Sequence, residues 1–342
     1  MQAVRFHRHG GSEVLQYESA PDPVLRPGWV IVKVAACALN HLDLWQRRGL
    51  DRVRIPFPHI SGADVAGTIV EIGAGVTGWA AGDRVMLQPG LSCGECEPCL
   101  AGRDNFCASY DVLGYQSSGG YAELTSVPAA NLIRLPASID FVTAAAFPLS
   151  FLTAWHMLLT RVGLSERDTV LVVAAGSGVG QASIQIAKAH RAVVITTAGS
   201  ADKRDRARAL GADHALDHHA DDVVARVREL TRGRGVDLVI EHVGTATWDR
   251  SVRCLARGGR LVTCGATTGH DAKLDLRHLF ARQLTIMGSY MGGKPELLEA
   301  AKLFFSGALR PVIDRTFPLS EVAQAQQRLE ASAQFGKIVL SI

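Results

Sequence analysis

The sequence predicts an α/β protein in which a β-rich domain is interrupted by a doubly wound parallel sheet. Residues 1–135 contain short β-branched runs punctuated by Gly and Pro, as expected for a compact β domain. From about residue 140 onward strands alternate with helices, which is the pattern of a parallel sheet covered by helices. Residues 312–317 and 337–342 are again strand-like, so the end of the chain can rejoin the first domain.

The individual elements follow from the hydrophobic pattern. In the β-rich region we expect strands at 30–36 and 64–72, a short helix at 40–48, and turns at 27–28, 73–75 and 82–83. In the second region we expect strands at 170–173, 193–197, 236–240, 259–264 and 284–287. The helices expected there and beyond it are 143–159, 202–210, 223–230, 248–256 and 294–307.

A glycine-rich turn follows the first strand of the second region. The run VLVV (170–173) leads into Gly176, Gly178 and Gly180, and a helical pattern begins directly afterwards. This context suits a dinucleotide pyrophosphate, because glycines let backbone N–H groups approach phosphate oxygens at a helix N-terminus. The strict motif places Gly where this chain has Ala175 and Ser177. Such turns also occur for packing reasons alone, so the turn by itself leaves both interpretations open.

The end of the next strand indicates which nucleotide is bound. NAD-binding sheets carry an Asp or Glu there, which binds the ribose 2′-hydroxyl. Here the strand runs into Thr-Thr-Ala-Gly-Ser (196–200) with no acid, and Ser200, Lys203 and Arg204 suit a 2′-phosphate. We therefore expect NADPH, although these residues also fit the solvated start of a helix.

Four of the seven cysteines fall within fifteen positions. Cys93, Cys96, Cys99 and Cys107 are spaced C-x2-C-x2-C-x7-C and can surround one tetrahedral Zn²⁺, with an iron–sulfur cluster as the competing interpretation. Four protein ligands leave no open position on the metal, so we expect this zinc to be structural. The other three cysteines lie in apolar surroundings and are expected to be buried.

Composition excludes several classes of protein. The 342 residues are 47% hydrophobic and 20% charged, and the net charge of +3 does not indicate binding to nucleic acid or to an anionic membrane. The first residues lack the apolar region of a signal peptide, and the apolar stretch 141–159 contains Pro and polar residues. We therefore expect a cytoplasmic protein.

Several motifs together resemble the medium-chain dehydrogenase/reductase superfamily, which includes zinc alcohol dehydrogenases and zinc-free quinone oxidoreductases. They are GADVAGTIVE (62–71), GDRV (82–85), the cysteine lobe, GYAE (120–123), LTA (152–154), AAGSGVG (174–180), GAD (211–213) and FGKIVL (335–340). The resemblance implies a GroES-like catalytic domain at 1–150, a Rossmann domain at 151–291 and a return to the catalytic domain at 292–342. It also implies a homodimer or tetramer, with dimers joined edge to edge through the strand at 284–290.

Departures from the family pattern indicate the chemistry. Alcohol dehydrogenases of the family hold a catalytic zinc with Cys, His and Cys, and the matching positions here are Asn40, Ala63 and Leu149 or Ser150. The family's proton-accepting hydroxyl and relay His fall at Leu42 and Trp45. Without this Lewis acid an alkoxide cannot be stabilised, whereas hydride addition to a C=C–C=O group needs only hydrogen-bond donors for the enolate.

The resemblance therefore implies a metal-free NADPH-dependent reductase of an enone, enoyl-CoA or quinone. Asn40 is expected to donate from its amide to the carbonyl or to the nicotinamide region, and Tyr115, or water, is the expected proton source. An alcohol dehydrogenase with an atypical metal site and a non-catalytic NADPH-binding protein remain alternatives. The expected cofactor-binding residues are His41, Thr153, Gly176, Ser177, Gly178, Val179, Gly180, Ser200, Lys203, His218, Val243, Gly244, Cys264, Gly265, Met287, Gly288 and Ser289.

Overall fold

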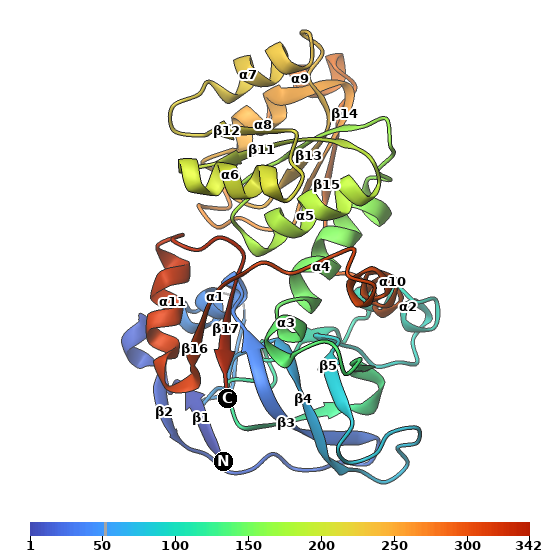
Figure 1. Ribbon diagram of the computed structural model, residues 1–342, viewed down its shortest axis with the longest axis vertical. Helices are drawn as coiled ribbons and strands as arrows, with labels where there is room; N and C mark the ends of the chain where they lie inside the picture. Colours follow the sequence, from blue (N-terminus) through green and yellow to red (C-terminus); the bar gives the residue numbers. More distant parts are fainter. Residues whose placement is uncertain (51–52) are drawn as a thin grey trace. The chain divides into compact units, whose positions relative to one another are not determined.

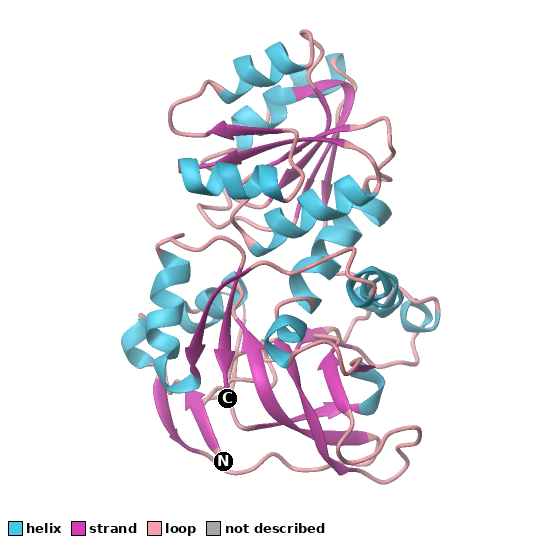
Figure 2. Ribbon diagram, viewed as in Figure 1, coloured by secondary structure: helices cyan, strands magenta, loops and turns pink. Residues whose placement is uncertain are grey.

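The computed structural model describes residues 1–50 and 53–342, which form two compact units (Figure 1). Unit 1 contains Met1–Leu149 and Gly293–Ile342, and unit 2 contains Ser150–Gly292. The chain thus leaves unit 1 after its first part and returns to it near the C-terminus. Figure 2 shows that strands dominate unit 1, whereas helices and strands share unit 2.

Unit 1 is built on a seven-stranded sheet. Its strands are ordered β16-β17-β3-β4-β5-β9, and β8 also pairs with β3. The bounds are β3 (Trp29–Ala38), β4 (Asp64–Ile72), β5 (Arg84–Leu87), β8 (Leu124–Pro128), β9 (Leu132–Arg134), β16 (Ile313–Pro318) and β17 (Lys337–Ser341). The last strand, β17, pairs antiparallel with β3, with Leu340 opposite Cys37. This pairing places the end of the chain beside residues near position 40.

Smaller elements complete unit 1. Two short ribbons are formed by β1 (Gln2–Arg5) with β2 (Gln16–Ser19) and by β6 (Gly90–Leu91) with β7 (Asp111–Val112). The helices are α1 (His41–Arg48), α2 (Glu97–Leu100), α3 (Phe141–Ala145), α10 (Lys294–Phe305) and α11 (Val322–Glu330). The core consists of the aliphatic side chains of β3, β4 and β5 packed against those of α11 and β17.

Unit 2 is built on a six-stranded sheet in which all strands are parallel. The order is β12-β11-β10-β13-β14-β15. The bounds are β10 (Thr169–Val172), β11 (Val193–Ala198), β12 (His214–Asp217), β13 (Val236–Glu241), β14 (Leu255–Thr263) and β15 (Thr285–Gly288). This is the strand order of dinucleotide-binding folds, in which ligands bind at the carboxyl ends of the strands where the order reverses. Here that point lies between β10 and β13.

Five helices alternate with these strands. They are α5 (Gly178–Ala189), α6 (Ala201–Ala209), α7 (Val223–Leu230), α8 (Trp248–Cys254) and α9 (Leu276–Ala281). Helices α5 and α6 pack on β11, whereas α7 and α8 pack against each other, as expected for a sheet wound in both directions from β10. The predicted fold class, an α/β chain with a β domain interrupted by a doubly wound parallel sheet, is confirmed.

The helix expected at 143–159 is interrupted. The structure has α3, then α4 (Pro148–Trp155), then a π-helical turn at His156–Arg161. Pro148 has no N–H to donate and disfavours helical geometry at the preceding residue, so the first helix ends before it. The strand β12 was not expected, because its four residues, HALD, show no clear alternation. No helix among the described residues has the length and apolar character to cross a membrane.

Candidate functional site

A buried polar cluster lies in unit 1 around Asn40, the residue expected to donate to a substrate carbonyl. Asn40 Nδ2 donates to Asp64 Oδ2 at 3.0 Å, and Lys337 Nζ donates to Asn40 Oδ1 at 2.6 Å and to Asp64 Oδ2 at 2.9 Å. Lys337 is 3% exposed and Asp64 is fully buried, so water does not screen this ion pair. The second Asn40 N–H faces Ala38 O at 3.5 Å, where a hydrogen bond is weak.

Asp64 also connects the three positions at which family alcohol dehydrogenases carry zinc ligands. It follows Ala63 in the chain, binds the Asn40 amide, and accepts from the backbone N–H of Leu149 at 2.7 Å. An amide, a methyl and an isobutyl group offer no thiolate or imidazole to a metal. Among the described residues, the only group of three or more His, Cys, Asp or Glu side chains able to hold one ion is the cysteine lobe.

Sequence reasoning did not find Lys337 or Asp64 as site residues, although both stand in the quoted motifs. A lysine inside the apolar run FGKIVL is the available signal, because a buried lysine requires a partner. The identity of that partner depends on the pairing of β17 with β3 and of β3 with β4.

A second buried carboxylate, Asp43, lies in the first turn of the adjacent helix α1. Asn40 is the residue before α1, and its backbone N–H donates to Asp43 Oδ2 at 2.8 Å, which is one half of a capping box. Tyr121 OH donates to the same oxygen at 2.8 Å. Burial raises the pKa of Asp43 to about 6, against the lowering effect of these donors.

Helix α1 also holds the loop that carries Tyr115, the expected proton donor. Gln46 Nε2 donates to the carbonyl oxygens of Gly114 and Tyr115, and Ser61 Oγ donates to Gln46 Oε1 at 2.6 Å. Burial raises the pKa of Tyr115, so its phenol stays protonated at neutral pH. His41, expected near the cofactor, is the first residue of α1, and its ring lies beside Trp45 with centroids 6.4 Å apart.

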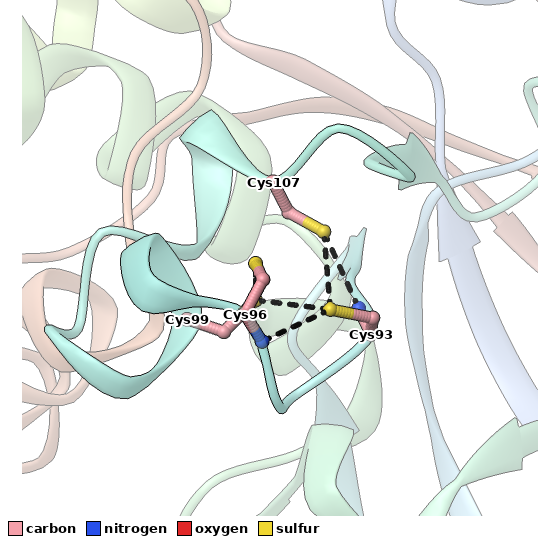
Figure 3. A group of neighbouring side chains, drawn as sticks. All are labelled: Cys93, Cys96, Cys99 and Cys107. Atoms are coloured by element: carbon pink, nitrogen blue, oxygen red, sulfur yellow. Dashed lines mark hydrogen bonds between the residues drawn. The ribbon is translucent and has the colours of Figure 1, made fainter.

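The four cysteines of the lobe converge as predicted (Figure 3). Their sulfur atoms all lie within 4.8 Å of one another, with Sγ–Sγ distances of 3.9 Å from Cys93 to Cys99, 3.4 Å from Cys96 to Cys99 and 3.5 Å from Cys107 to Cys93. Four sulfurs about 2.3 Å from a central Zn²⁺ are separated by about 3.8 Å, so the set fits one zinc ion. A cluster of several irons holds its thiolates further apart.

Backbone groups favour the thiolate form of one of these cysteines, Cys93, and a backbone hydrogen bond anchors the lobe. N–H groups of Glu95 and Cys96 donate to Cys93 Sγ and lower the pKa of Cys93 to about 6, which favours the thiolate that metals bind. Asp104, buried within the lobe, accepts from the backbone N–H of Lys294 at 2.8 Å. The lobe is thereby joined to the first turn of α10, also in unit 1.

In unit 2 the glycine-rich turn joins β10 to α5, and Ser177 and Gly180 fix its conformation. Ser177 is the N-cap of α5, and its Oγ accepts from Gly180 N at 2.8 Å. A Cβ atom at Gly180 would lie 2.3 Å from the carbonyl oxygen of Ala174, so only glycine fits there. Ala174 adopts φ 57°, a strained value for alanine, and its N–H donates to Thr197 Oγ1 at 3.0 Å.

At the end of β13, Glu241 organises the segment that contains the expected residues Val243 and Gly244. Its fully buried carboxylate accepts from the backbone N–H groups of His242, Val243 and Gly244 at 2.9, 2.6 and 3.1 Å. The hydroxyls of Thr247 and Ser251 donate to it as well. The sequence analysis did not identify Glu241. The one feature of the sequence that points to it is a charged residue at the end of an otherwise apolar strand.

The remaining candidates lie mainly at other strand ends. Cys264 and Gly265 follow β14, burial raises the pKa of the Cys264 thiol to about 12, and Met287 and Gly288 end β15. Because all strands are parallel, these ends share one edge of the sheet with the glycine turn. The buried Ser289 Oγ has no partner among the described residues. Thr153 lies on α4 and is 5% exposed.

No acid stands at the end of β11 itself, as the sequence indicated, but Asp217 at the end of β12 lies opposite Ala198, the last residue of β11. Ser200 caps α6, and Arg204, next to Lys203, is paired with Asp217 at 2.5 Å. The imidazoles of His218 and His219 lie 4.3 Å apart, and a Cβ atom on Gly199 would approach their Nε2 atoms to 3.0 and 2.9 Å. Arg204 is thus engaged with Asp217, while Lys203 and two histidines surround the end of the strand.

Comparisons with known proteins agree with this architecture. Residues 26–137 match the family described as "Alcohol dehydrogenase GroES-like domain", and residues 178–306 match "Zinc-binding dehydrogenase". The chain is 32% identical to the NAD-dependent alcohol dehydrogenase of Sulfolobus acidocaldarius, with 100% of both chains covered. It is 31% identical to the acryloyl-coenzyme A reductase of Metallosphaera sedula, covering 99% of this chain and 98% of the relative.

One solved structure of a related protein has the same fold over the whole of this chain. It is described as "Crystal Structure of NAD-dependent alcohol dehydrogenase", and it matches with a TM-score of 0.97 and 45% identity over 100% of both chains. The chain therefore belongs to the medium-chain dehydrogenase/reductase superfamily and is an oxidoreductase of that type, with a GroES-like domain and a cysteine lobe suited to a structural zinc ion.

Proposed function

We propose that this oxidoreductase uses NADPH to reduce an activated C=C bond of an enone, enoyl-CoA or quinone, with zinc in a structural role only. The observation that carries the proposal is the environment of Asp64, which joins Asn40 to Leu149 and follows Ala63. These residues supply no donor set for a catalytic metal, so the chemistry must succeed without a Lewis acid. The similarity to an acryloyl-coenzyme A reductase supports this reaction class.

The proposed reaction is a hydride addition followed by a protonation. A bound NADPH would supply the hydride to the β-carbon of the substrate, whose C=C π electrons would move toward the carbonyl and leave an enolate. The second N–H of Asn40, which is only weakly engaged with Ala38, donates to the enolate oxygen. Tyr115 or water then protonates the α-carbon.

Lys337 and Asp64 serve this step as positioning residues. Lys337 binds Oδ1 of the Asn40 amide and Asp64 binds its Nδ2, so the amide cannot rotate and its remaining N–H has a defined direction. A preorganised donor stabilises developing charge without the reorganisation that water would require.

The cofactor is assigned to unit 2. The proposed pyrophosphate site is the N-terminus of α5 with Gly176, Ser177, Gly178, Val179 and Gly180. Ser200, Lys203 and His218 are proposed to bind the 2′-phosphate, since the end of β11 offers cations and hydroxyl but no free acid. Gly265, Gly288 and the unpartnered Ser289 hydroxyl are proposed to line the ribose and nicotinamide.

A substrate panel combined with metal analysis tests this function. The purified protein is assayed with NADPH and NADH against enones, crotonyl-CoA, acryloyl-CoA and quinones, and with NADP⁺ and NAD⁺ against primary and secondary alcohols. We expect reduction of at least one unsaturated carbonyl with NADPH and one zinc ion per chain. Two zinc ions per chain with alcohol oxidation would overturn the proposal in favour of an alcohol dehydrogenase, the activity named for several relatives. Dinucleotide binding without turnover on any substrate would favour a non-catalytic role.

A further inference from the structure

His242 makes a contact that joins the two strands at which the order of the sheet reverses. It follows β13, and its Nε2 atom lies 2.9 Å from the carbonyl oxygen of Val173, directly after β10. The same Nε2 atom lies 3.2 Å from Ser177 Oγ in the glycine-rich turn. His242 is 8% exposed, so its ring is part of the interior of unit 2.

These distances determine the tautomer of His242. A backbone carbonyl oxygen can only accept a hydrogen bond, so a bare Nε2 lone pair 2.9 Å from Val173 O would be repelled. Nε2 therefore carries the hydrogen, which it shares between Val173 O and Ser177 Oγ. Burial lowers the pKa of His242, in keeping with a neutral ring.

The tautomer in turn determines what the Ser177 hydroxyl can do. Ser177 Oγ accepts from the backbone N–H of Gly180 at 2.8 Å and from the His242 Nε2–H at 3.2 Å. A hydroxyl oxygen has two lone pairs, and these two donors occupy both. Its hydrogen must then point away from both donors, and no acceptor for it is found among the described residues. Ser177 is half-buried, at the first turn of α5.

We propose that His242 is a positioning residue that holds the Ser177 hydroxyl so that its hydrogen is donated to a phosphate oxygen of a bound dinucleotide. The inference rests on the proposed pyrophosphate site but does not depend on the 2′-phosphate or on the substrate. It explains how a turn with serine in place of glycine binds pyrophosphate: the hydroxyl adds a neutral donor beside the N–H groups of the α5 N-terminus.

A double-mutant cycle read out by calorimetric ligand binding tests the inference without turnover. The variants are Ser177→Ala, His242→Leu and the double variant, and the ligands are NADPH, ADP-ribose and adenosine 2′-monophosphate, which lacks a pyrophosphate. A lost hydrogen bond to a charged group corresponds to a roughly tenfold or larger loss of affinity. We expect such losses for NADPH and ADP-ribose in either single variant and none for adenosine 2′-monophosphate. Adding His242→Leu to Ser177→Ala should cause no further loss.

Two controls separate this role from a purely structural one. His242→Gln places an amide N–H near the position of Nε2 and should restore most of the ADP-ribose affinity, whereas His242→Leu should not. Additive losses in the double variant, or equal losses with adenosine 2′-monophosphate, would overturn the inference. If the wild-type protein binds ADP-ribose and the variants bind it equally well, only the inference fails. If the wild-type protein binds no dinucleotide, the proposed function fails as well.

Discussion

The ammonium group of Lys337 lies 2.6 Å from Oδ1 of Asn40, joining two residues that are 297 positions apart in the chain. The same ammonium neutralises the buried carboxylate of Asp64. Strand β17 therefore supplies the positive charge that neutralises Asp64 and the hydrogen bond that orients the Asn40 amide.

Replacing Lys337 with Met should strongly destabilise unit 1. The change leaves Asp64 charged, buried and without its cation, which costs about 3–5 kcal/mol of unfolding free energy. Chemical denaturation measures this loss. Lys273→Met, at an exposed lysine of unit 2, should change stability by less than about 0.5 kcal/mol. The double change Lys337→Met with Asp64→Asn should recover part of the loss, and a single variant as stable as the wild type would show that the pair is not required.

Two replacements of Asn40 test its proposed role in the reaction. Asn40→Ala and Asn40→Ser both remove the amide that binds Lys337 and Asp64, whereas the backbone N–H of residue 40 can still donate to Asp43. We expect kcat for the best unsaturated substrate to fall about 10²-fold in both variants. The Asn40 side chain makes no cap hydrogen bond to α1, so the Ala variant should lose no more helix-cap stability than the Ser variant. Full activity of Asn40→Ser would remove Asn40 from the mechanism.

Asp43 should make the stability of the protein depend on pH. Its pKa is about 6 in the folded protein against 3.8 for a solvated aspartate, so the folded state binds this proton more tightly. Its stabilising contribution is complete below pH 3.8 and is lost as pH rises through about 6, with a total on the order of 3 kcal/mol. The difference in unfolding free energy between wild type and Asp43→Asn should therefore change across this window. If this difference in unfolding free energy did not change with pH, the predicted contribution of Asp43 would be contradicted.

The cysteine lobe should stabilise unit 1 through its zinc. Cys107→Ser replaces a buried ligand, so the protein should lose about one zinc ion per chain, measured by mass spectrometry of the metal, and its melting temperature should fall. Cys254→Ser alters a buried cysteine outside the lobe and should leave the zinc content unchanged. Iron and sulfide in the wild-type protein would contradict a zinc site.

Selectivity for NADPH over NADH should increase as the pH falls through and below 6.5, the ordinary pKa of a histidine. Burial first, and then His219, Arg250 and Lys203, lower the pKa of His218, while Asp217 opposes them. A bound 2′-phosphate favours the imidazolium, so affinity for NADPH should rise as His218 takes up its proton. His218→Gln should make the affinity for NADPH independent of pH in this range, and the affinity for NADH should not vary with pH in either protein.

Lys203→Glu should weaken the binding of NADPH much more than the binding of NADH. Equal losses of affinity for the two cofactors would refute the assignment of Lys203 to the 2′-phosphate.

The sequence alone was sufficient where the signal is local. The β/α alternation, the C-x2-C-x2-C-x7-C spacing and the missing acid after the second strand of unit 2 each lie within a short segment, because periodicity, ligand spacing and strand-end chemistry are properties of neighbouring residues. The doubly wound sheet and the converging cysteines confirm the first two. Local reasoning failed at Pro148, where the apolar pattern continues across a residue that can begin a helix but cannot lie in its interior.

Only the tertiary structure decided the partners of the buried polar groups. The contacts of Lys337 with Asn40 and of His242 with Ser177 follow from which strands become neighbours in each sheet, and the contact of Asp64 with Leu149 follows from where α4 begins. These pairs are 297, 65 and 85 positions apart, and no local pattern encodes such separations. The sequence by itself determined the family, the fold class and the cysteine lobe. The tertiary structure determined the arrangement around Asn40 and the glycine turn. The physical reason is that a buried polar side chain requires a hydrogen-bond partner, and the fold brings that partner from a distant part of the chain.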